Sequence, residues 1–376
     1  MQITRVRCYR PRRANPTFNQ SDMVVTVETD AGITGVGEGG SPDMLAQCAG
    51  MLIGEDPGRI QHLWQLVYRG FFYPPGHEKL HALGALDLAL WDIQGKRLGV
   101  PVYELLGGLT RDYVECYATG YPWQGTLEDT ARACVAAGFR AFRTGVVDPP
   151  SDRVFDARRM VDRTFAHCQA IRAAIGPDAD WSIDFHTRLD LADAVRLCGM
   201  IEPLSPLFVE DPLRSENPGA LAALRPQVRL PIAVGEQFGD RWDVHELVER
   251  HLIDYTRVTL PNVGGITEFM KIAAICETHY VGMIPHFTGP IALAALVHAL
   301  CALPVPALME VTGAGPGALP HLPRGCSFRD GKLWPAPLPG LGVEFDPAGA
   351  ELVAEVDAHS APIPQLRRPD GSYTNW

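Results

Sequence analysis

The sequence lacks the patterns of a membrane span, a disulfide framework or a nucleic-acid-binding surface. Its most apolar stretch, residues 291–303, contains His298, precedes Pro304 and is shorter than the ~20 residues that cross a bilayer. Nine cysteines form an odd set without C-x-x-C spacing, which argues against disulfides and structural zinc. The chain carries 33 basic and 44 acidic residues, a net charge of −11, without a run of Lys or Arg. We therefore expect neither a membrane nor a nucleic acid as partner.

The N-terminal residues also lack the apolar segment of a signal peptide. We accordingly expect a cytoplasmic protein with free thiols.

What is present is enough apolar material for a large core. The 376 residues are 46% hydrophobic and 20% charged, and the length favours a large domain plus a smaller one. Residues 23–29 alternate as a strand, residues 30–32 suit a turn, and residues 33–38 resume the strand, whereas residues 82–96 have the pattern of a buried helix. Residues 1–112 are therefore predicted to form a small α+β domain.

From residue 113 onwards, short apolar runs alternate with segments of helical length. Eight candidate strands cover residues 114–118, 141–146, 181–185, 207–209, 232–234, 255–260, 281–284 and 307–311. Such alternation fits a (β/α)₈-type barrel or an open doubly wound sheet, and the length of residues 113–312 favours the barrel. Residues 313–376 are expected to return to the first domain. The predicted fold class is α/β, a (β/α)₈-type barrel with an α+β domain.

Three consecutive candidate strands end in an acid. Asp184, Glu210 and Glu236 are spaced 26 residues apart, about the length of one βα unit, so the carboxylates should meet at the rim where barrels place active sites. Converging hard oxygen ligands suit Mg²⁺. The alternative interpretation is that the acids cap the following helices or are solvated loop charges.

Two histidines are spaced so that they should lie at the same rim as these acids. His286 lies two units of 25 residues beyond Glu236, and His186 follows Asp184 by two positions, on the same face of its strand. Histidines beside a metal-bound substrate can exchange protons near neutral pH. Glu310, at the end of the eighth candidate strand, is a further candidate or only a polar residue of the rim.

Residues 35–40, Gly-Val-Gly-Glu-Gly-Gly, match the G-x-G-x-x-G pattern of dinucleotide-binding proteins. The motif opens no helix of a βαβ unit and is not followed by an acid-terminated strand, so we interpret it as a turn or a site of close backbone packing.

Several motifs together resemble those of the enolase superfamily, in its mandelate racemase/muconate lactonizing enzyme branch. They are the three acid-terminated strands, Gly264-Gly-Ile-Thr-Glu and Pro285-His. Others resemble the galactonate dehydratase group in particular: Asp184-Phe-His-Thr-Arg, Tyr68-Arg-Gly-Phe-Phe-Tyr, Leu90-Trp-Asp-Ile-Gln-Gly-Lys and the closing Asn375-Trp.

The resemblance implies a modified TIM barrel with a capping domain whose loops, about residues 16–21 and 71–77, close over a sugar acid. Asn19 and Tyr73 of these loops are the predicted substrate contacts, with Glu310 near the substrate carboxylate. The same resemblance implies three Mg²⁺ ligands, Asp184, Glu210 and Glu236, with His186 as general acid and His286 as base. Relatives often form homo-oligomers, and we expect one here.

Two positions depart from the family pattern. Thr259 stands where most members have an Asp that pairs with the seventh-strand histidine, so His286 lacks that partner. Mannonate dehydratases similarly carry Thr in this strand and use an Arg on the second strand with a Tyr elsewhere. Arg143 matches that Arg, but no long, Tyr-bearing loop follows it, so the predicted base is His286 or a group assisted by Arg143. The Lys-x-Lys of racemizing relatives is absent, since residues 143–145 are Arg-Thr-Gly.

The predicted function is Mg²⁺-dependent dehydration of an aldonic or related sugar acid to a 2-keto-3-deoxy acid, by a carbon–oxygen lyase. A racemase or epimerase of a 2-hydroxy acid is one alternative, because it needs a base on each face of the α-carbon and two histidines are present. A protein that binds metal and sugar acids with little turnover is the other.

Overall fold

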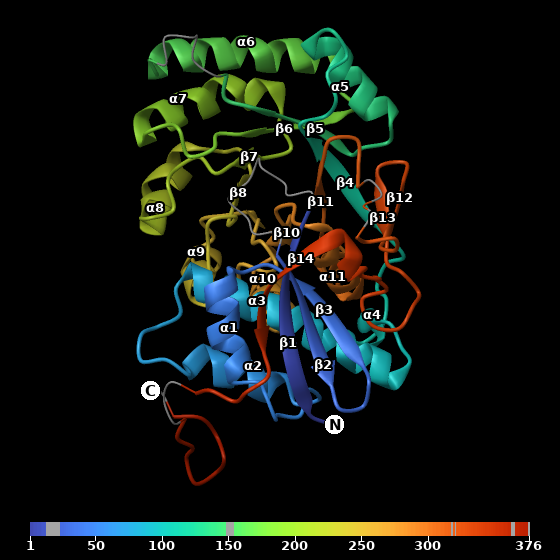
Figure 1. Cartoon of the computed structure of the whole chain (residues 1–376). Coiled ribbons are helices and arrows are strands. Elements are labelled where there is room, and N and C mark those ends of the chain that lie inside the picture. The colour runs from blue at the N-terminus through green and yellow to red at the C-terminus, as the bar shows by residue number, and fades with distance from the viewer. Residues whose placement is uncertain (13–22, 148–153, 317–318, 320, 362–364, 375–376) are drawn as a thin grey trace.

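The computed structural model describes residues 1–12, 23–147, 154–316, 319, 321–361 and 365–374. It contains a small antiparallel sheet with helices on one side and a larger parallel sheet surrounded by helices (Figure 1). The small sheet has the order β14-β1-β2-β3. Its strands are β1 (Ile3–Pro11), β2 (Val24–Thr29), β3 (Thr34–Glu38) and β14 (Ala350–Val356). The predicted turn between β2 and β3 is present, with Gly32 at a φ of 74°.

Three helices of the capping region pack against this sheet: α1 (Pro42–Gly50), α2 (Ile60–Arg69) and α3 (His77–Leu98). Gly35 and Gly37 of β3 face α3, where any side chain would collide with the carbonyl oxygens of Ala89 and Ala85. The first two glycines of the G-x-G-x-x-G match therefore serve close helix–strand packing, as the sequence interpretation proposed.

Eight parallel strands close into a barrel, which confirms the predicted fold class and excludes the open sheet. They are β4 (Val114–Thr119), β5 (Ala141–Gly145), β6 (Asp180–Asp184), β7 (Val209–Glu210), β8 (Ile232–Val234), β9 (Tyr255–Thr256), β10 (Gly282–Met283) and β11 (Met309–Thr312). Closure comes from the pairing of β11 with β4 and from a bridge between Met283 and Ala307. Several strands are shorter than predicted, because the chain leaves the ladder once it reaches the rim; β9, for example, ends at Thr256 and not at Leu260.

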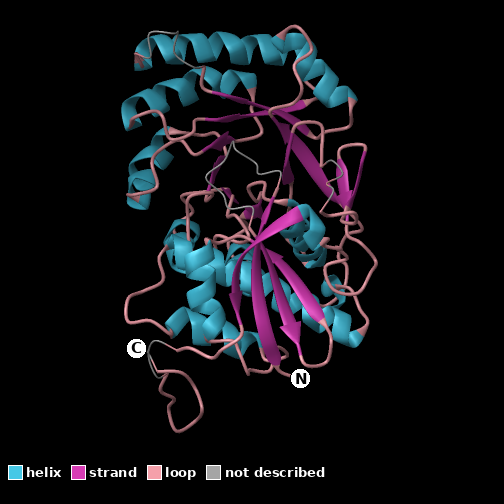
Figure 2. Ribbon diagram, viewed as in Figure 1, coloured by secondary structure: helices cyan, strands magenta, loops and turns pink. Residues whose placement is uncertain are grey.

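Helices cover the outside of the barrel (Figure 2). They are α5 (Leu127–Ala136), α6 (Ala157–Ile175), α7 (Leu191–Ile201), α8 (Leu221–Leu224), α9 (Arg241–Glu249), α10 (Ile266–Glu277) and α11 (Pro290–Ala302), while α4 (Val102–Leu105) precedes the barrel. Short 3₁₀ turns cover Glu202–Leu204, Pro218–Ala220, Arg225–Gln227 and Pro347–Gly349. The most apolar stretch of the sequence is α11, which is buried on all sides. Among the described helices, none combines the length and apolarity that crossing a bilayer requires.

The C-terminal segment contacts both sheets. A hairpin of β12 (Ser327–Arg329) and β13 (Lys332–Trp334) pairs with β4, and β14 then pairs with β1. The exact domain boundaries, 1–112, 113–312 and 313–376, stay a prediction. The nine cysteines are free thiols, and eight are buried.

Hydrogen bonds join α3 to the start of α10. The buried Asp87 carboxylate accepts bonds from the Thr267 amide at 3.0 Å and the Thr267 hydroxyl at 2.6 Å. Trp64 Nε1 donates to the Gly264 carbonyl at 2.8 Å, and Trp91 Nε1 to Thr267 Oγ1 at 3.0 Å. The capping helices are thus fixed to the barrel directly after its sixth strand.

Asp87 should make the stability of the protein depend on pH. Burial raises its pKa to about 7 from the usual 3.8, against the opposing hydrogen bonds from Thr267. The folded state therefore holds this proton more tightly, and the resulting stabilisation is full below pH 3.8 and lost as the pH rises through about 7. We expect Asp87→Asn, which cannot ionise, to gain stability relative to wild type by up to about 4 kcal/mol between pH ~4 and ~8. Urea unfolding of both proteins across this range measures the difference, and a difference independent of pH would contradict the prediction.

Candidate functional site

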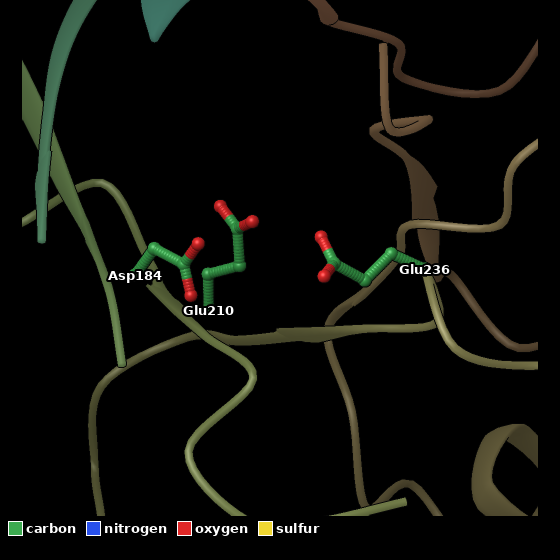
Figure 3. Close-up of side chains that lie close together, drawn as sticks. All are labelled: Asp184, Glu210 and Glu236. Carbon is green, nitrogen blue, oxygen red and sulfur yellow. The ribbon is translucent and has the colours of Figure 1, made fainter. Parts of the chain in front are cut away.

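The three predicted carboxylates meet at the carboxyl ends of β6, β7 and β8. One oxygen from each of Asp184, Glu210 and Glu236 lies within 4.8 Å of the others, and Figure 3 shows the Glu236 carboxylate pointing toward the other two. Asp184 and Glu210 are fully buried, whereas the Glu236 side chain is 18% exposed. The even spacing in the sequence therefore does bring these acids together at one height of the barrel.

Two arginines lie within this cluster. Arg257, directly after β9, is fully buried, and its Nη2 is 2.6 Å from both Glu210 Oε1 and Glu310 Oε2. Arg143, on β5, contacts Asp184 and places Nε 3.4 Å from Glu210 Oε2 and Nη1 3.6 Å from Glu310 Oε1. Sequence reasoning missed Arg257, although a charged residue within an apolar strand is itself a signal, since a buried guanidinium needs acidic partners.

Burial and the two arginines shift the pKa values of Glu210 and Glu310 in opposite directions. Burial raises the pKa of Glu210 to about 7, although Arg143 and Arg257 oppose the shift. Burial alone would also raise the pKa of Glu310, but Arg257 and Arg143 outweigh it and lower that pKa to about 2. Glu310, on β11, is therefore a permanent anion held by two guanidinium groups.

Asp211 is a further buried acid that the sequence analysis did not select. Burial raises its pKa well above the usual value, and the neighbouring Glu236 and Glu210 raise it further. Its backbone has a φ of 38°, a strained conformation for a residue with a side chain. A proton on Asp211 removes one negative charge from a region that already contains several.

The donor set fits a hard divalent cation. Asp184 Oδ2 and both oxygens of Glu210 accept no well-aligned hydrogen bond from a described residue. Buried carboxylate oxygens grouped within a few ångströms are the ligands that Mg²⁺ prefers. Asp184, Glu210 and Glu236 are thus the residues able to hold such an ion.

The two predicted histidines both reach the cluster. His186 Nε2 lies 2.6 Å from Asp184 Oδ2 and 3.1 Å from Arg143 Nη2, with its side chain 50% exposed. His286 Nε2 lies 3.3 Å from Glu236 Oε2, with its side chain almost buried. The expectation that His186 shares a strand face with Asp184 is wrong, because β6 ends at Asp184 and a turn with His186 at a φ of 46° brings the ring back.

Both imidazoles are shifted toward the neutral form. Burial lowers the pKa of His286 below 6.5. Burial, followed by the charge of Arg143, lowers the pKa of His186 in the same direction. Neutral imidazole accepts protons, whereas a half-exposed imidazole can also regain a proton from water.

The sequence analysis also singled out Tyr73, Asn19 and Thr259. Tyr73 is 77% exposed, packs its ring on Phe72, and makes no hydrogen bond to the site's acids or histidines within the described part of the chain. Asn19 lies outside the described residues. Thr259 is fully buried, and its hydroxyl has no hydrogen-bond partner among the described residues. His286 instead donates its backbone amide to the Arg257 carbonyl at 3.3 Å.

The chain matches known proteins over its whole length. Residues 4–107 match the mandelate racemase/muconate lactonizing enzyme N-terminal domain, and residues 126–349 match the enolase C-terminal domain-like model. The chain is 37% identical over its full length to the full length of the D-galactonate dehydratase of Ralstonia nicotianae, and 35% to that of Pectobacterium atrosepticum.

Solved structures of relatives superpose closely. An enolase from Pantoea ananatis with bound D-gluconate and Mg has a TM-score of 0.83 at 27% identity, with 93% of each chain covered. A putative galactarate dehydratase from Agrobacterium radiobacter, with bound Na and L-malate, has a TM-score of 0.83 at 30% identity, with 99% of each chain covered.

The fold is that of the enolase superfamily. Within it, the chain belongs to the mandelate racemase/muconate lactonizing enzyme family, which confirms the resemblance drawn from the sequence motifs.

Proposed function

We propose that this chain is a Mg²⁺-dependent dehydratase that converts an aldonic or related sugar acid into a 2-keto-3-deoxy acid. Full-length identity of 35–37% to D-galactonate dehydratases makes the chain a sugar acid dehydratase, a carbon–oxygen lyase. The observation that carries the proposal is the convergence of Asp184, Glu210 and Glu236, whose ligand atoms lie within 4.8 Å of one another.

A Mg²⁺ ion held by these three acids would supply Lewis-acid stabilisation of the negative charge that develops on the substrate carboxylate. Side chains of the protein carry out the proton transfers. A proton next to a carboxylate is weakly acidic, so its removal needs a base held at the reacting carbon.

His286 is the proposed base. Its burial keeps the imidazole neutral at neutral pH, and its position beside Glu236 places it at the edge of the acidic cluster. The C2 proton passes to this imidazole, and the developing charge is spread onto the substrate carboxylate. Thr259 offers no carboxylate to this ring, and the His286 backbone is held by the hydrogen bond from its amide to the Arg257 carbonyl.

His186 is the proposed acid. In its protonated, imidazolium form it gives a proton to the C3 hydroxyl, the C3–O bond breaks, and water leaves. The resulting enol loses its hydroxyl proton and gains one at C3 to become the 2-keto-3-deoxy acid, and His286 releases the proton that it took from C2. The half-exposed ring then takes a proton back from solvent. Arg143, which contacts both His186 and Asp184, is proposed to help fix this geometry and to hold the anionic substrate.

Purified protein should release 2-keto-3-deoxy product from one or a few acids of a panel of aldonic and aldaric acids when Mg²⁺ is present. We expect EDTA to reduce product to background and added Mg²⁺ to restore it, as measured by colorimetric detection of the keto acid. Undiminished activity after exhaustive EDTA dialysis would contradict the metal requirement.

Other outcomes of the same panel favour the alternatives. Solvent deuterium exchange at the α-carbon without product would favour an epimerase. Neither exchange nor product, with sugar acid bound, would favour a protein that binds with little turnover. Size-exclusion chromatography with light scattering tests the proposed homo-oligomer.

A further inference from the structure

Glu38 joins the capping sheet to the segment that carries His286. We propose that Glu38 is a positioning residue for His286, acting across the contact between the small sheet and the barrel. The inference rests on the proposed function, in which His286 removes the α-proton.

The Glu38 carboxylate caps the barrel helix α11. Its Oε2 accepts hydrogen bonds from the amides of Ile291 at 2.8 Å and Ala292 at 2.9 Å, and the residue is only 3% exposed. These amides belong to the first turn of α11, where a carboxylate also interacts favourably with the helix dipole.

The helix supplies no such cap itself. Gly289 is its N-cap residue and has no side chain, and Pro290 follows it. The nearest atoms to a Cβ added at Gly289 are all from the Glu38 carboxylate, so a side chain there would displace the cap. The sequence of α11 is therefore complementary to a cap that comes from β3.

The segment between His286 and this cap is short and held at several points. The His286 amide bonds to the Arg257 carbonyl at 3.3 Å, and the Phe287 amide to Glu310 Oε2 at 3.3 Å. Glu38 fixes the chain at the start of α11, a few residues later. These main-chain attachments fix the backbone that carries the base.

The same arrangement occurs once more on the neighbouring helix and offers a matched control. Asp87 accepts a hydrogen bond from the Thr267 amide in the first turn of α10, whose N-cap is also a glycine, Gly265. A Cβ on Gly265 would overlap Asp87. Because α10 does not follow the strand that carries His286, loss of Asp87 should perturb stability without moving the base.

The proposal also accounts for the rest of the G-x-G-x-x-G match. Gly39 and Gly40, with φ of 128° and 78°, turn the chain directly after Glu38, and a Cβ on Gly39 would collide with His81. The motif thus positions the Glu38 carboxylate to cap the N-terminus of α11.

The test compares Glu38→Ala, Glu38→Gln and Asp87→Ala in the full-length protein with Mg²⁺. We expect Glu38→Ala to lower the rate of solvent deuterium exchange at the substrate α-carbon by roughly 10–100-fold, with KM nearly unchanged. Glu38→Gln keeps an acceptor oxygen and should recover most of this rate. Asp87→Ala should leave the exchange rate within about threefold of wild type.

A second readout does not depend on turnover. The ¹⁵N-imidazole signal of His286, assigned by its absence in His286→Asn, should shift in Glu38→Ala but not in Asp87→Ala. If wild type forms no keto acid, the proposed function fails, and this signal still tests the position of the ring. Equal effects of Glu38→Ala and Asp87→Ala on the signal, or an unchanged signal in Glu38→Ala, would overturn the proposal. If Glu38→Ala does not fold, Glu38→Gln and Glu38→Asp are compared in the same way.

Discussion

Glu210→Gln is expected to weaken Mg²⁺ binding by at least ~100-fold and to reduce dehydration by roughly 1,000-fold or more. Glu210 stands between Asp184 and Glu236, within the 4.8 Å group, and is fully buried. The substitution preserves shape but replaces one anionic oxygen by an amide nitrogen, which does not coordinate a hard cation. It also leaves Arg257 with one carboxylate fewer. Isothermal titration with Mg²⁺ and the keto-acid assay measure the two effects.

Glu216→Gln is the matched control for this change. Glu216 is exposed and pairs with Arg214, so its loss should alter neither metal binding nor rate. Retention of tight Mg²⁺ binding by folded Glu210→Gln would remove Glu210 from the ligand set.

His286→Asn and His186→Asn are expected to separate the two proton transfers. Without its proposed base, His286→Asn should lose both α-proton exchange and dehydration by roughly 100–10,000-fold. His186→Asn should lose dehydration to a similar degree yet retain exchange, because removal of the α-proton does not need the acid. Proton NMR in D₂O follows exchange, and the keto-acid assay follows elimination.

The exposed His251 provides the control, since its φ of 52° is a conformation that asparagine accepts readily. Dehydration at the wild-type rate by His186→Asn would exclude His186 as the acid. Exchange at the wild-type rate by His286→Asn would exclude His286 as the base.

The sequence was informative where one periodicity governs both fold and chemistry. A constant interval between Asp184, Glu210 and Glu236 predicts both a βα repeat and a shared rim, and the structure brings these acids together. The position of Glu310 on the eighth strand, beside the first, follows from the same closure.

Other features depend on geometry that periodicity does not encode. His186 reaches Asp184 because the backbone makes a left-handed turn at His186, and not because the two residues alternate along a strand. The role of Arg257 depends on acids that arrive from other strands, so its place in the site could not be read from its own strand. The part played by Glu38 depends on a contact with a helix some 250 positions away in the chain, which no local motif records.

The glycine N-caps of α10 and α11 bear on the exchange of parts between related barrels. A chimaera could join this barrel to the small domain of a relative. That domain would need acids at the positions equivalent to Asp87 and Glu38, close enough to accept hydrogen bonds from the first turns of α10 and α11. Without them, the first turns of two barrel helices would keep buried amides without acceptors. A successful graft must therefore transfer each acid together with the glycine that makes room for it.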